Sequence, residues 1–448
     1  EPGHTHTIFD DEWYSRDKGF LSSSTAHFKR HQEETRLQPN TFTGNTVRWE
    51  AERIEASDLQ IEAKELIRLY GREGLTFKSG EESLFYEEKT QREKKGFGHS
   101  GLVYGQSERG AWQRFKGQMQ TPNTLISRGD IALRSEGPMG LSYTDLLTQE
   151  NLTVHGASIA YTAGTQQIET DHRAWQHRSG LSVGVQGLGS VGAMQQGIGT
   201  LQAAGERADS KTQTLYRMAA ARAFYDTSQQ IKDTGMRVAL GWGEQSRQAQ
   251  AKTKQTQSLA SRIEVGRALS LQASEGDIEL AHTHLRAKEV ELTALHGTIE
   301  IKAVQNTQTS SYRQVREQTG VEIGVSANRQ GLGLDIGMQQ TEGLGQGKQQ
   351  EIAWQASTVK GDVVQVRTQD LTLLGSTIKA EQLTLDIARN LRMISLMDDW
   401  HQAQEEQRTQ RQAQIGLSGP LASTLSFAEL EQDGRAEFKG VNTQAGLK

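Results

Sequence analysis

Two pairs of histidines are the first candidates for chemistry in this chain. His4 with His6, and His282 with His284, lie two positions apart, so in a strand the two imidazoles of a pair would point to the same side. Metal sites use three or four ligands with supporting groups, and no Asp or Glu of the same strand completes either set. We therefore expect surface histidines and no metal site.

Two pairs of adjacent acids are the next candidates. Asp10 with Asp11, and Asp398 with Asp399, could be the carboxylates of a polysaccharide-cleaving enzyme, because glycosidases place two carboxyl groups across the scissile bond. The pattern favours another interpretation, in which these acids cap or solvate turns. We therefore predict no catalytic residue and expect that the chain is not an enzyme.

The segment Gly187-Leu-Gly189-Ser-Val-Gly192 matches the G-x-G-x-x-G pattern of dinucleotide sites. Such a site needs a helix that opens at the third glycine and an acid about 20 residues later. Gly197 and Gly199 follow at once and would interrupt that helix. The sequence therefore predicts part of a hairpin here, and no cofactor.

The composition limits the classes of protein to which the chain can belong. It has 448 residues, a net charge of −5, no Cys, 46 Gly, 5 Pro and a hydrophobic fraction of 34%. Without Cys there is no disulfide, thiolate metal site or Cys nucleophile. No run approaches the ~18 apolar residues of a membrane helix, and the nearly neutral charge gives no support for nucleic-acid binding. So few apolar residues indicate either partial disorder or the thin core of stacked repeats.

Apolar residues recur in alternating pairs at a constant step. Leu269 and Leu271 match Val290 and Leu292 after 21 residues, and each pair has the two-residue period of a strand with one buried face. Steps of 19 to 21 residues relate further pairs: Ile278 with Ile299, Ile131/Leu133 with Leu152/Val154, Val364/Val366 with Leu383/Leu385, and Leu371/Leu373 with Leu391/Met393. This spacing predicts a coil that returns to the same face after about 20 residues, each circuit forming one rung.

A second repeat overlies the first. A polar stretch leads into glycine and then into alternating Gly and aliphatic residues, most clearly in Ser179 to Val185, Gly320 to Ser326 and Gly331 to Gly337. We expect long β-hairpins extruded from the coil, with their glycine faces lying flat on the rungs. The polar runs Glu87 to Lys95 and Gln402 to Gln414 could bind a surface or a partner, but solvated hairpin strands explain them better. The apolar hairpin faces are the best functional candidates, since they could pair with other β edges or a membrane.

The predicted fold is all-β: a right-handed parallel β-helix with extruded β-hairpins and one inserted α-helix. Helical spacing without Pro places that helix near residues 206–231. The predicted organisation is a degenerate first repeat or cap at 1–46, the repeat coil at 47–430 and a terminal tail at 431–448, with hairpins near 97–119, 179–200, 234–247, 319–341 and 414–434.

These repeated segments resemble the haemagglutinin repeats of large bacterial exoproteins, the filamentous haemagglutinin family of two-partner secretion. The resemblance is carried by Leu269 to Leu280, by Asn390 to Asp399 and by the polar lead into Gly320 to Ser326. It extends from about residue 47 to 430. Within that family the chain also resembles effectors of contact-dependent growth inhibition, although it is rich in Gln and Arg where Ser and Thr usually dominate.

The resemblance implies a secreted segment displayed at the bacterial cell surface or outer membrane, which helps to move a toxin into a target cell. The implied partners are the outer-membrane two-partner transporter during export, the target-cell outer membrane or a surface receptor, and the rest of the same long polypeptide. Glu1 to His4 contain no initiator Met or signal peptide, which also indicates a longer parent. Two alternatives stay open: an adhesin stalk that binds host or bacterial surfaces, and an extracellular polysaccharide-degrading β-helix enzyme.

Overall fold

The computed structural model describes residues 3–19, 21–99, 102–186, 236–328, 331–416 and 424–447. Every regular element in these ranges is a strand, which confirms the all-β prediction. None of the described residues forms a helix that could cross a membrane. The helix expected near 206–231 and the segment Gly187 to Gly192 lie outside the described residues.

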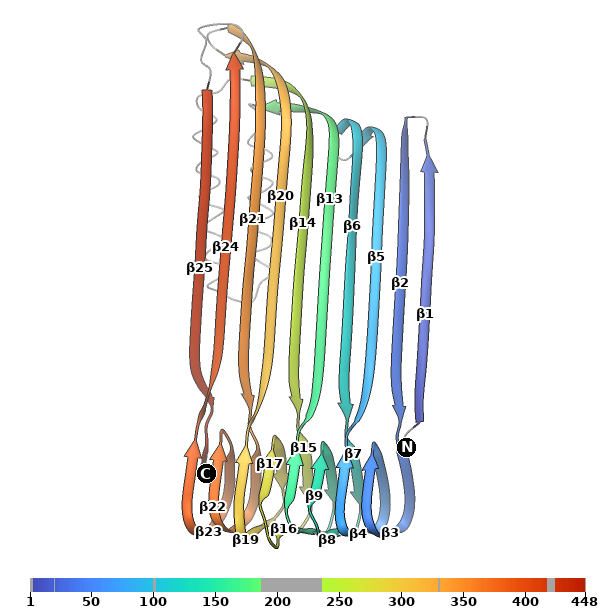
Figure 1. Cartoon of the computed structure of the whole chain (residues 1–448), viewed down its shortest axis with the longest axis vertical. Coiled ribbons are helices and arrows are strands. Elements are labelled where there is room, and N and C mark those ends of the chain that lie inside the picture. Colours follow the sequence, from blue (N-terminus) through green and yellow to red (C-terminus); the bar gives the residue numbers. More distant parts are fainter. Residues whose placement is uncertain are drawn as a thin grey trace.

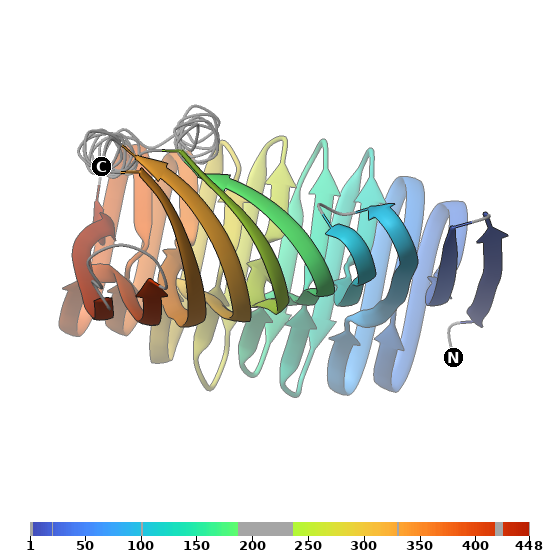
Figure 2. The same ribbon diagram turned by 90° about the horizontal axis from the view of Figure 1, so that it is seen from above.

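The strands form two sheets (Figure 1). A sheet of 16 strands with parallel pairing closes around one apolar core, and Figure 2 shows its rungs side by side along one axis. Its strands are β3 (Asn40–Ser57), β4 (Leu59–Lys78), β7 (Asn123–Ser127), β8 (Asp130–Ser135), β9 (Met139–Ser142), β10 (Thr144–Thr148), β11 (Leu152–Gly156), β12 (Ile159–Thr162), β15 (Ser261–Val265), β16 (Ala268–Ala273), β17 (Ile278–Ala281), β18 (Thr283–Arg286), β19 (Glu289–Lys302), β22 (Thr358–Leu374), β23 (Thr377–Ile394) and β26 (Gly446–Leu447).

The second sheet, called here the hairpin sheet, has ten long antiparallel strands that rise from the coil (Figure 1). They are β1 (Gly3–Lys18), β2 (Ser22–Gln38), β5 (Gly80–His99), β6 (Leu102–Thr121), β13 (Gly164–Gln186), β14 (Met236–Leu259), β20 (Val304–Asn328), β21 (Gly331–Gln355), β24 (Leu396–Gly416) and β25 (Thr424–Thr443).

The predicted rung step is confirmed residue by residue. Leu269 pairs with Val290 and Ile278 with Ile299 in parallel register, and the other predicted pairs are register partners as well. Equivalent side chains therefore stack inside the coil. One such stack, less than 3% exposed throughout, consists of Ile61, Leu125, Leu146, Ile263, Leu285, Val359 and Ile378. Each buried side chain of this size contributes roughly 1.5–3 kcal/mol.

At one corner of the coil, successive rungs alternate between two backbone paths. In every second rung the chain passes the corner through a residue with positive φ, namely Asp58, Tyr143, His282 or Gly375. In the other rungs a hairpin leaves at the same corner. Buried Asn, Ser and Thr side chains line this corner and bond the backbone of the neighbouring rung, as where the Ser261 hydroxyl accepts from the backbone N–H of Thr144 at 3.1 Å. A long hairpin thus replaces a single left-handed residue without leaving these backbone groups unsatisfied.

Two rungs of coil separate each hairpin from the next. Neighbouring strands lie ~4.8 Å apart, so two rungs rise ~9.6 Å, which is also the width of a two-stranded hairpin. Consecutive hairpins therefore meet edge to edge, as β2 with β5, β6 with β13, β14 with β20, and β21 with β24. The equal spacing of rungs and hairpins makes one continuous sheet possible.

This arrangement corrects one prediction. The glycine faces of the hairpins do not lie flat on the rungs, because the hairpins stand away from the coil and pair with one another (Figure 1). Hydrogen bonding between neighbouring hairpins satisfies their edges, which packing on the rungs would leave open.

The predicted hairpin segments lie within this sheet, with longer strands. The segment 97–119 lies in β5 and β6, 319–341 in β20 and β21, and the described part of 414–434 in β24 and β25. The described residues of the segments near 179–200 and 234–247 pair with each other, as arms of β13 and β14. The expected cap at 1–46 contains the hairpin β1–β2 and the start of β3.

Candidate functional site on the hairpin sheet

Five glycines from five neighbouring strands form one transverse row of the hairpin sheet, called here the glycine row. The register partners across β5, β6, β13, β14 and β20 are Gly96, Gly105, Gly180, Gly243 and Gly320. The sequence repeat shows that glycine ends each polar stretch. Only the pairing of the strands shows that these glycines align.

Close backbone contacts explain why four positions of this row, all except Gly320, are glycine. Gly180 has φ of +146° and Gly96 has φ of +124°, where L side chains are strained. A Cβ atom at Gly180 would lie 2.3 Å from the carbonyl oxygen of Tyr104, and one at Gly105 would lie 2.2 Å from that of Ser179. The upper ends of β13 and β14 bend away from the direction of their lower parts (Figure 1). The glycine row therefore permits a bend across the sheet.

Beyond the glycine row, one face of the sheet carries apolar side chains in continuous rows. Trp242, Val321 and Met338 are register partners, and the next row on this face contains Leu240, Ile323, Ile336 and Ile415. Trp242 is 61% exposed and Met338 59%. We call the whole set the distal apolar face; it consists of Tyr104, Leu240, Trp242, Val321, Ile323, Val325, Leu334, Ile336, Met338 and Ile415. Exposed apolar surface gathered in this way is typical of an interaction site.

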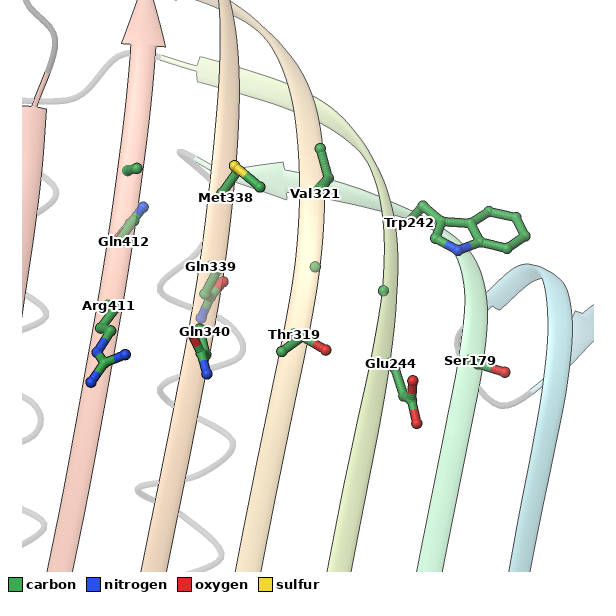
Figure 3. Close-up of a pocket in the computed structure, with 13 residues that line it drawn as sticks. Ser179, Trp242, Glu244, Thr319, Val321, Met338, Gln339, Gln340, Arg411 and Gln412 are labelled. Atoms are coloured by element: carbon green, nitrogen blue, oxygen red, sulfur yellow. The ribbon is translucent and has the colours of Figure 1, made fainter.

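A cavity of about 470 Å³ lies where the distal apolar face meets the bend (Figure 3). Trp242, Val321 and Met338 form its apolar part, and Glu244 and Arg411 its charged part. The glycine row removes side chains from neighbouring positions of β14 and β20. This mixed lining suits an amphipathic group with an apolar body and a polar end.

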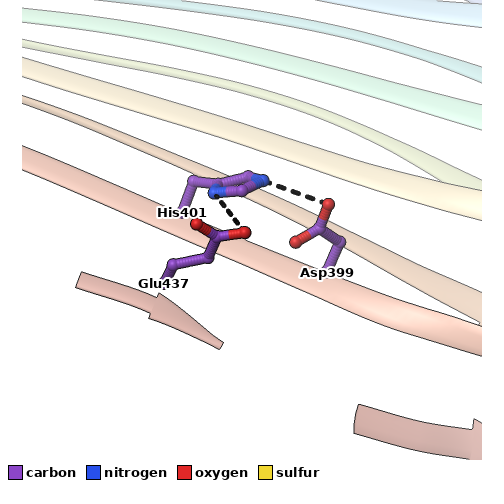
Figure 4. Close-up of side chains that lie close together, drawn as sticks. All are labelled: Asp399, His401 and Glu437. Atoms are coloured by element: carbon purple, nitrogen blue, oxygen red, sulfur yellow. Dashed lines mark hydrogen bonds and ion pairs between the residues drawn. The ribbon is translucent and has the colours of Figure 1, made fainter. Parts of the chain in front are cut away.

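A second cluster lies at the base of the last hairpin (Figure 4). His401 shares a 3.0 Å hydrogen bond between its Nε2 atom and Asp399, and its Nδ1 atom lies 3.9 Å from Glu437. Ligand atoms from the three residues lie within 4.8 Å of one another. Each imidazole nitrogen faces a different carboxylate, so a cation on Nε2 would have two protein ligands and Glu437 as a supporting group. Zinc sites ordinarily use three or four.

Asp398 and Asp399 therefore have different roles. Asp398 accepts a hydrogen bond from the backbone N–H of Trp354 at 2.9 Å, which ties β24 to the base of the preceding hairpin. The site residues His401 and Glu437 were not predicted from the sequence, because Glu437 comes from the following strand. The Asp-x-His spacing of Asp399 and His401 was the available sign.

His282 and His284 lie at a corner of the coil, with their ring centroids 5.5 Å apart. His282 is buried and shares a 2.7 Å hydrogen bond between Nδ1 and the hydroxyl of Ser258. Burial, with a smaller effect of His284, lowers the pKa of His282 to about 4, and burial also lowers the pKa of His284. The prediction of a surface residue is wrong for His282, because this corner residue of positive φ is buried and bonded to Ser258.

The remaining candidates lie on the first hairpin. His4 and His6 are exposed on β1, and His6 shares a 3.2 Å hydrogen bond with Thr35. Asp10 and Asp11 lie in the middle of the same strand, not at a turn. Asp10 bonds His31 at 2.7 Å and Asp11 accepts from Arg30 at 3.2 Å across the hairpin. These acids are thus cross-strand partners. The hydrogen bonds of His31 to Asp10 and Glu33 raise its pKa.

Known proteins that are similar in sequence also contain repeats, in agreement with the repeated rungs of the fold. The model of the hemagglutinin repeat matches residues 241–411. A deoxyribonuclease CdiA of Dickeya dadantii is 24% identical over 99% of this chain and 14% of its own length. A toxin CdiA of Yersinia pestis is 25% identical over 89% of this chain and 12% of its own length. No solved structure matches the chain.

The chain spans less than a sixth of the length of these two relatives. Its coil and hairpin sheet define an all-β repeat protein of the haemagglutinin-repeat class. Within that class it resembles filamentous haemagglutinin-like proteins and is similar to CdiA proteins over most of its length. The name deoxyribonuclease refers to the whole protein of Dickeya dadantii.

Proposed function

We propose that the chain is a structural and translocation segment of a secreted, cell-surface protein that delivers a toxin in contact-dependent growth inhibition. The observation that carries the proposal is the distal apolar face, which the hairpins hold away from the coil by the length of their polar lower parts. The similarity to CdiA proteins over most of the chain supports it.

In this proposal the coil is the rigid support. We take it to be a right-handed parallel β-helix, because connections between parallel strands of one sheet are right-handed in nearly all proteins. The boundaries at 1–46, 47–430 and 431–448 remain part of the proposal, as does a helix near 206–231. The flanking parts of the same polypeptide would continue the ladders at β3 and β23.

The distal apolar face would be covered when the segment acts, by the outer membrane or a surface receptor of the target cell. At roughly 25 cal/mol per Å² of buried apolar area, such contacts would strongly favour the covered state. An outer-membrane two-partner transporter would export the parent protein. We assign no enzymatic activity to this segment, and any nuclease activity would belong to another part of the parent.

Shortening one hairpin tests the proposal. In the full-length parent, removal of residues 320–341 would join Thr319 to Glu342. The register partners of these two residues are Gln340 and Glu317, so the junction lies beside the glycine row. We expect normal export and display but loss of target-cell killing. A matched control removes an equal length of the lower polar part, residues 307–317 with 342–352, and keeps the distal apolar face. Normal killing by the 320–341 variant would refute the role of this face.

A change without deletion sharpens the test. Val321→Ser with Ile323→Ser reduces the apolar character of one strand and keeps the pairing of β20. Gln318→Ser with Gly320 retained changes the same strand below the bend and serves as the control. We expect reduced killing only for the first variant, with equal amounts of both proteins at the cell surface.

A further inference from the structure

Five arginines form a second transverse row of the hairpin sheet, four residues from the glycine row on the same face. The row runs through Arg92 on β5, Arg109 on β6, Arg247 on β14, Arg316 on β20 and Arg408 on β24. Gln176 and Gly343 occupy the two positions between them. All five arginines are exposed. We call this set the arginine row.

The register places like charges next to one another. Arg92 is the direct partner of Arg109, and Arg247 of Arg316. Directly opposed like charges destabilise a sheet. None of these five side chains has an ion pair or hydrogen bond within the described residues. The protein therefore presents a line of unneutralised cations that spans seven strands, about 29 Å at ~4.8 Å per strand.

The face that carries the arginine row has a groove beside it. The next row on that face has small side chains, with Ala111, Ala174 and Ala249 as register partners. They form the floor of a cavity of about 510 Å³ that also includes Tyr312 and Gln314. Small residues in one row and long arginines in the next create a shallow channel that crosses the strands.

The groove continues toward the first hairpin. A neighbouring cavity of about 560 Å³ is lined by Arg92, Arg109, Ala111 and the aromatic pair Trp13 and Phe28. The two rings stack with centroids 5.8 Å apart and lie in the same transverse row as the alanine floor. Aromatic rings thus stand toward both ends of a channel that is bordered by arginines.

The opposite face of the sheet has the reverse charge at the same height. Glu93, Glu108, Glu317 and Glu342 occupy one row there. Several of these carboxylates have partners, since Glu108 accepts from Trp175 at 3.1 Å and Glu93 pairs with Lys95 at 2.9 Å. The cationic groove is therefore a property of one face and not of the hairpins in general.

We propose that this groove binds a linear polysaccharide that bears carboxylates. Guanidinium groups bind carboxylates in bidentate geometry, and a row of them suits a polymer with regularly repeated charges. The methyl groups of the alanine floor and the ring of Tyr312 offer apolar surface to sugar rings. Gln176 and Gln314 offer amide groups to hydroxyls. This binding site is separate from the distal apolar face and does not depend on the proposed delivery function.

Binding can be measured on the purified chain by calorimetry with oligogalacturonate, a linear polymer of carboxylate-bearing sugars. Neutral dextran of equal length is the control ligand. We expect binding of oligogalacturonate and none of dextran. Replacement of all five arginines of the row by Gln should weaken binding more than about tenfold. Equal binding of dextran, or no binding of oligogalacturonate, would overturn the proposal.

A matched variant separates the groove from general charge. The opposite face carries the same total charge on Lys89, Arg114, Lys116, Lys348 and Arg435, and replacement of these five by Gln should change affinity less than about twofold. Ala249→Phe fills the floor without a change of charge and should weaken binding. Thermal melting of each variant checks folding. Equal losses on both faces, or tighter binding of polyglutamate or single-stranded DNA than of oligogalacturonate, would refute a polysaccharide site.

Discussion

Arg262 and Asp145 are bonded across neighbouring rungs although 117 positions separate them in the chain. The guanidinium donates to Asp145 from both Nε at 3.1 Å and Nη2 at 2.6 Å, and the backbone N–H of Arg262 donates to the other carboxylate oxygen at 2.9 Å. The hairpin β13–β14 leaves and returns between these rungs. The pair thus fixes the register with which the coil resumes.

Asp145→Asn should lower the free energy of unfolding by about 1–2 kcal/mol, because a buried carboxylate with three donors loses its charge. Urea denaturation measures the change. Glu150→Gln is the control, since Glu150 pairs with Arg267 at 3.0 Å in an exposed position, where an ion pair contributes below about 1 kcal/mol. Equal effects of the two substitutions would contradict the role of Asp145 in register.

Leu271→Asp should disrupt the coil. Leu271 is fully buried and stacks between Val154 and Leu292, so an ionised carboxylate there would lie in the core without a partner. We expect a loss of several kcal/mol, more than about 3. Thr153→Asp, on the outward face of the neighbouring rung, should be nearly neutral. An unchanged melting curve for Leu271→Asp would contradict the rung assignment.

Gly180→Ala should destabilise the hairpin sheet at the bend. The new Cβ would lie 2.3 Å from the carbonyl oxygen of Tyr104, and φ is +146°, so a loss of about 1–3 kcal/mol is expected. Gly345→Ala is the matched control, since no atom lies within 4 Å of its Cβ position. Hydrogen exchange of β6 and β13 would report the local effect. Equal protection in both variants would argue against a strained glycine row.

Tyr161→Phe should stabilise the coil. The Tyr161 ring is fully buried, and its hydroxyl has no hydrogen-bond partner among the described residues. Burial raises the pKa of this phenol well above its ordinary value. Removal of an unsatisfied buried hydroxyl should raise the free energy of unfolding by roughly 1 kcal/mol. A decrease in stability would mean that the hydroxyl has a partner, such as a bound water.

His282 should make stability depend on pH. Its pKa is 6.5 when unfolded and about 4 when folded, so the folded state favours the neutral ring. The free energy of unfolding is therefore not reduced by His282 above pH 6.5. It decreases as the pH falls from 6.5 to 4, by at most about 3 kcal/mol, because only the unfolded state takes up the proton.

His282→Asn should reduce that acid loss, since Asn tolerates positive φ and does not titrate. His296→Asn, at an exposed position of β19, is the control substitution. The free energy of unfolding at pH 7 and pH 4.5 measures both. Identical pH profiles for the original protein and His282→Asn would refute the assignment.

The coil could be predicted from sequence because its period is local. Leu269 and Val290 repeat after one rung, and inward and outward residues alternate within each strand. Glycine at the end of each polar stretch likewise predicted hairpins. The direction of the hairpins could not be predicted, because it depends on the pairing of β2 with β5 and of β6 with β13, strands that belong to different hairpins.

The arginine row shows the same limit. The texts Arg92-Glu-Lys-Lys-Gly96 and Arg316-Glu-Gln-Thr-Gly320 run toward the bend, and Gly105 to Arg109 and Gly243 to Arg247 run away from it. The constant spacing of four residues between Arg and Gly was available in the sequence. This spacing predicts a row of arginines only when the antiparallel pairing that brings these residues into register is known.

The sequence by itself determined the length of the rung, the segments that form hairpins and the thin core, because strand period and turn residues act over a few positions. The tertiary structure decided which hairpins become neighbours and which faces carry the apolar, glycine and arginine rows. The physical reason is the common strand spacing: two rungs rise by ~9.6 Å, the width of one hairpin. The coil thereby sets the register in which distant glycines and arginines meet.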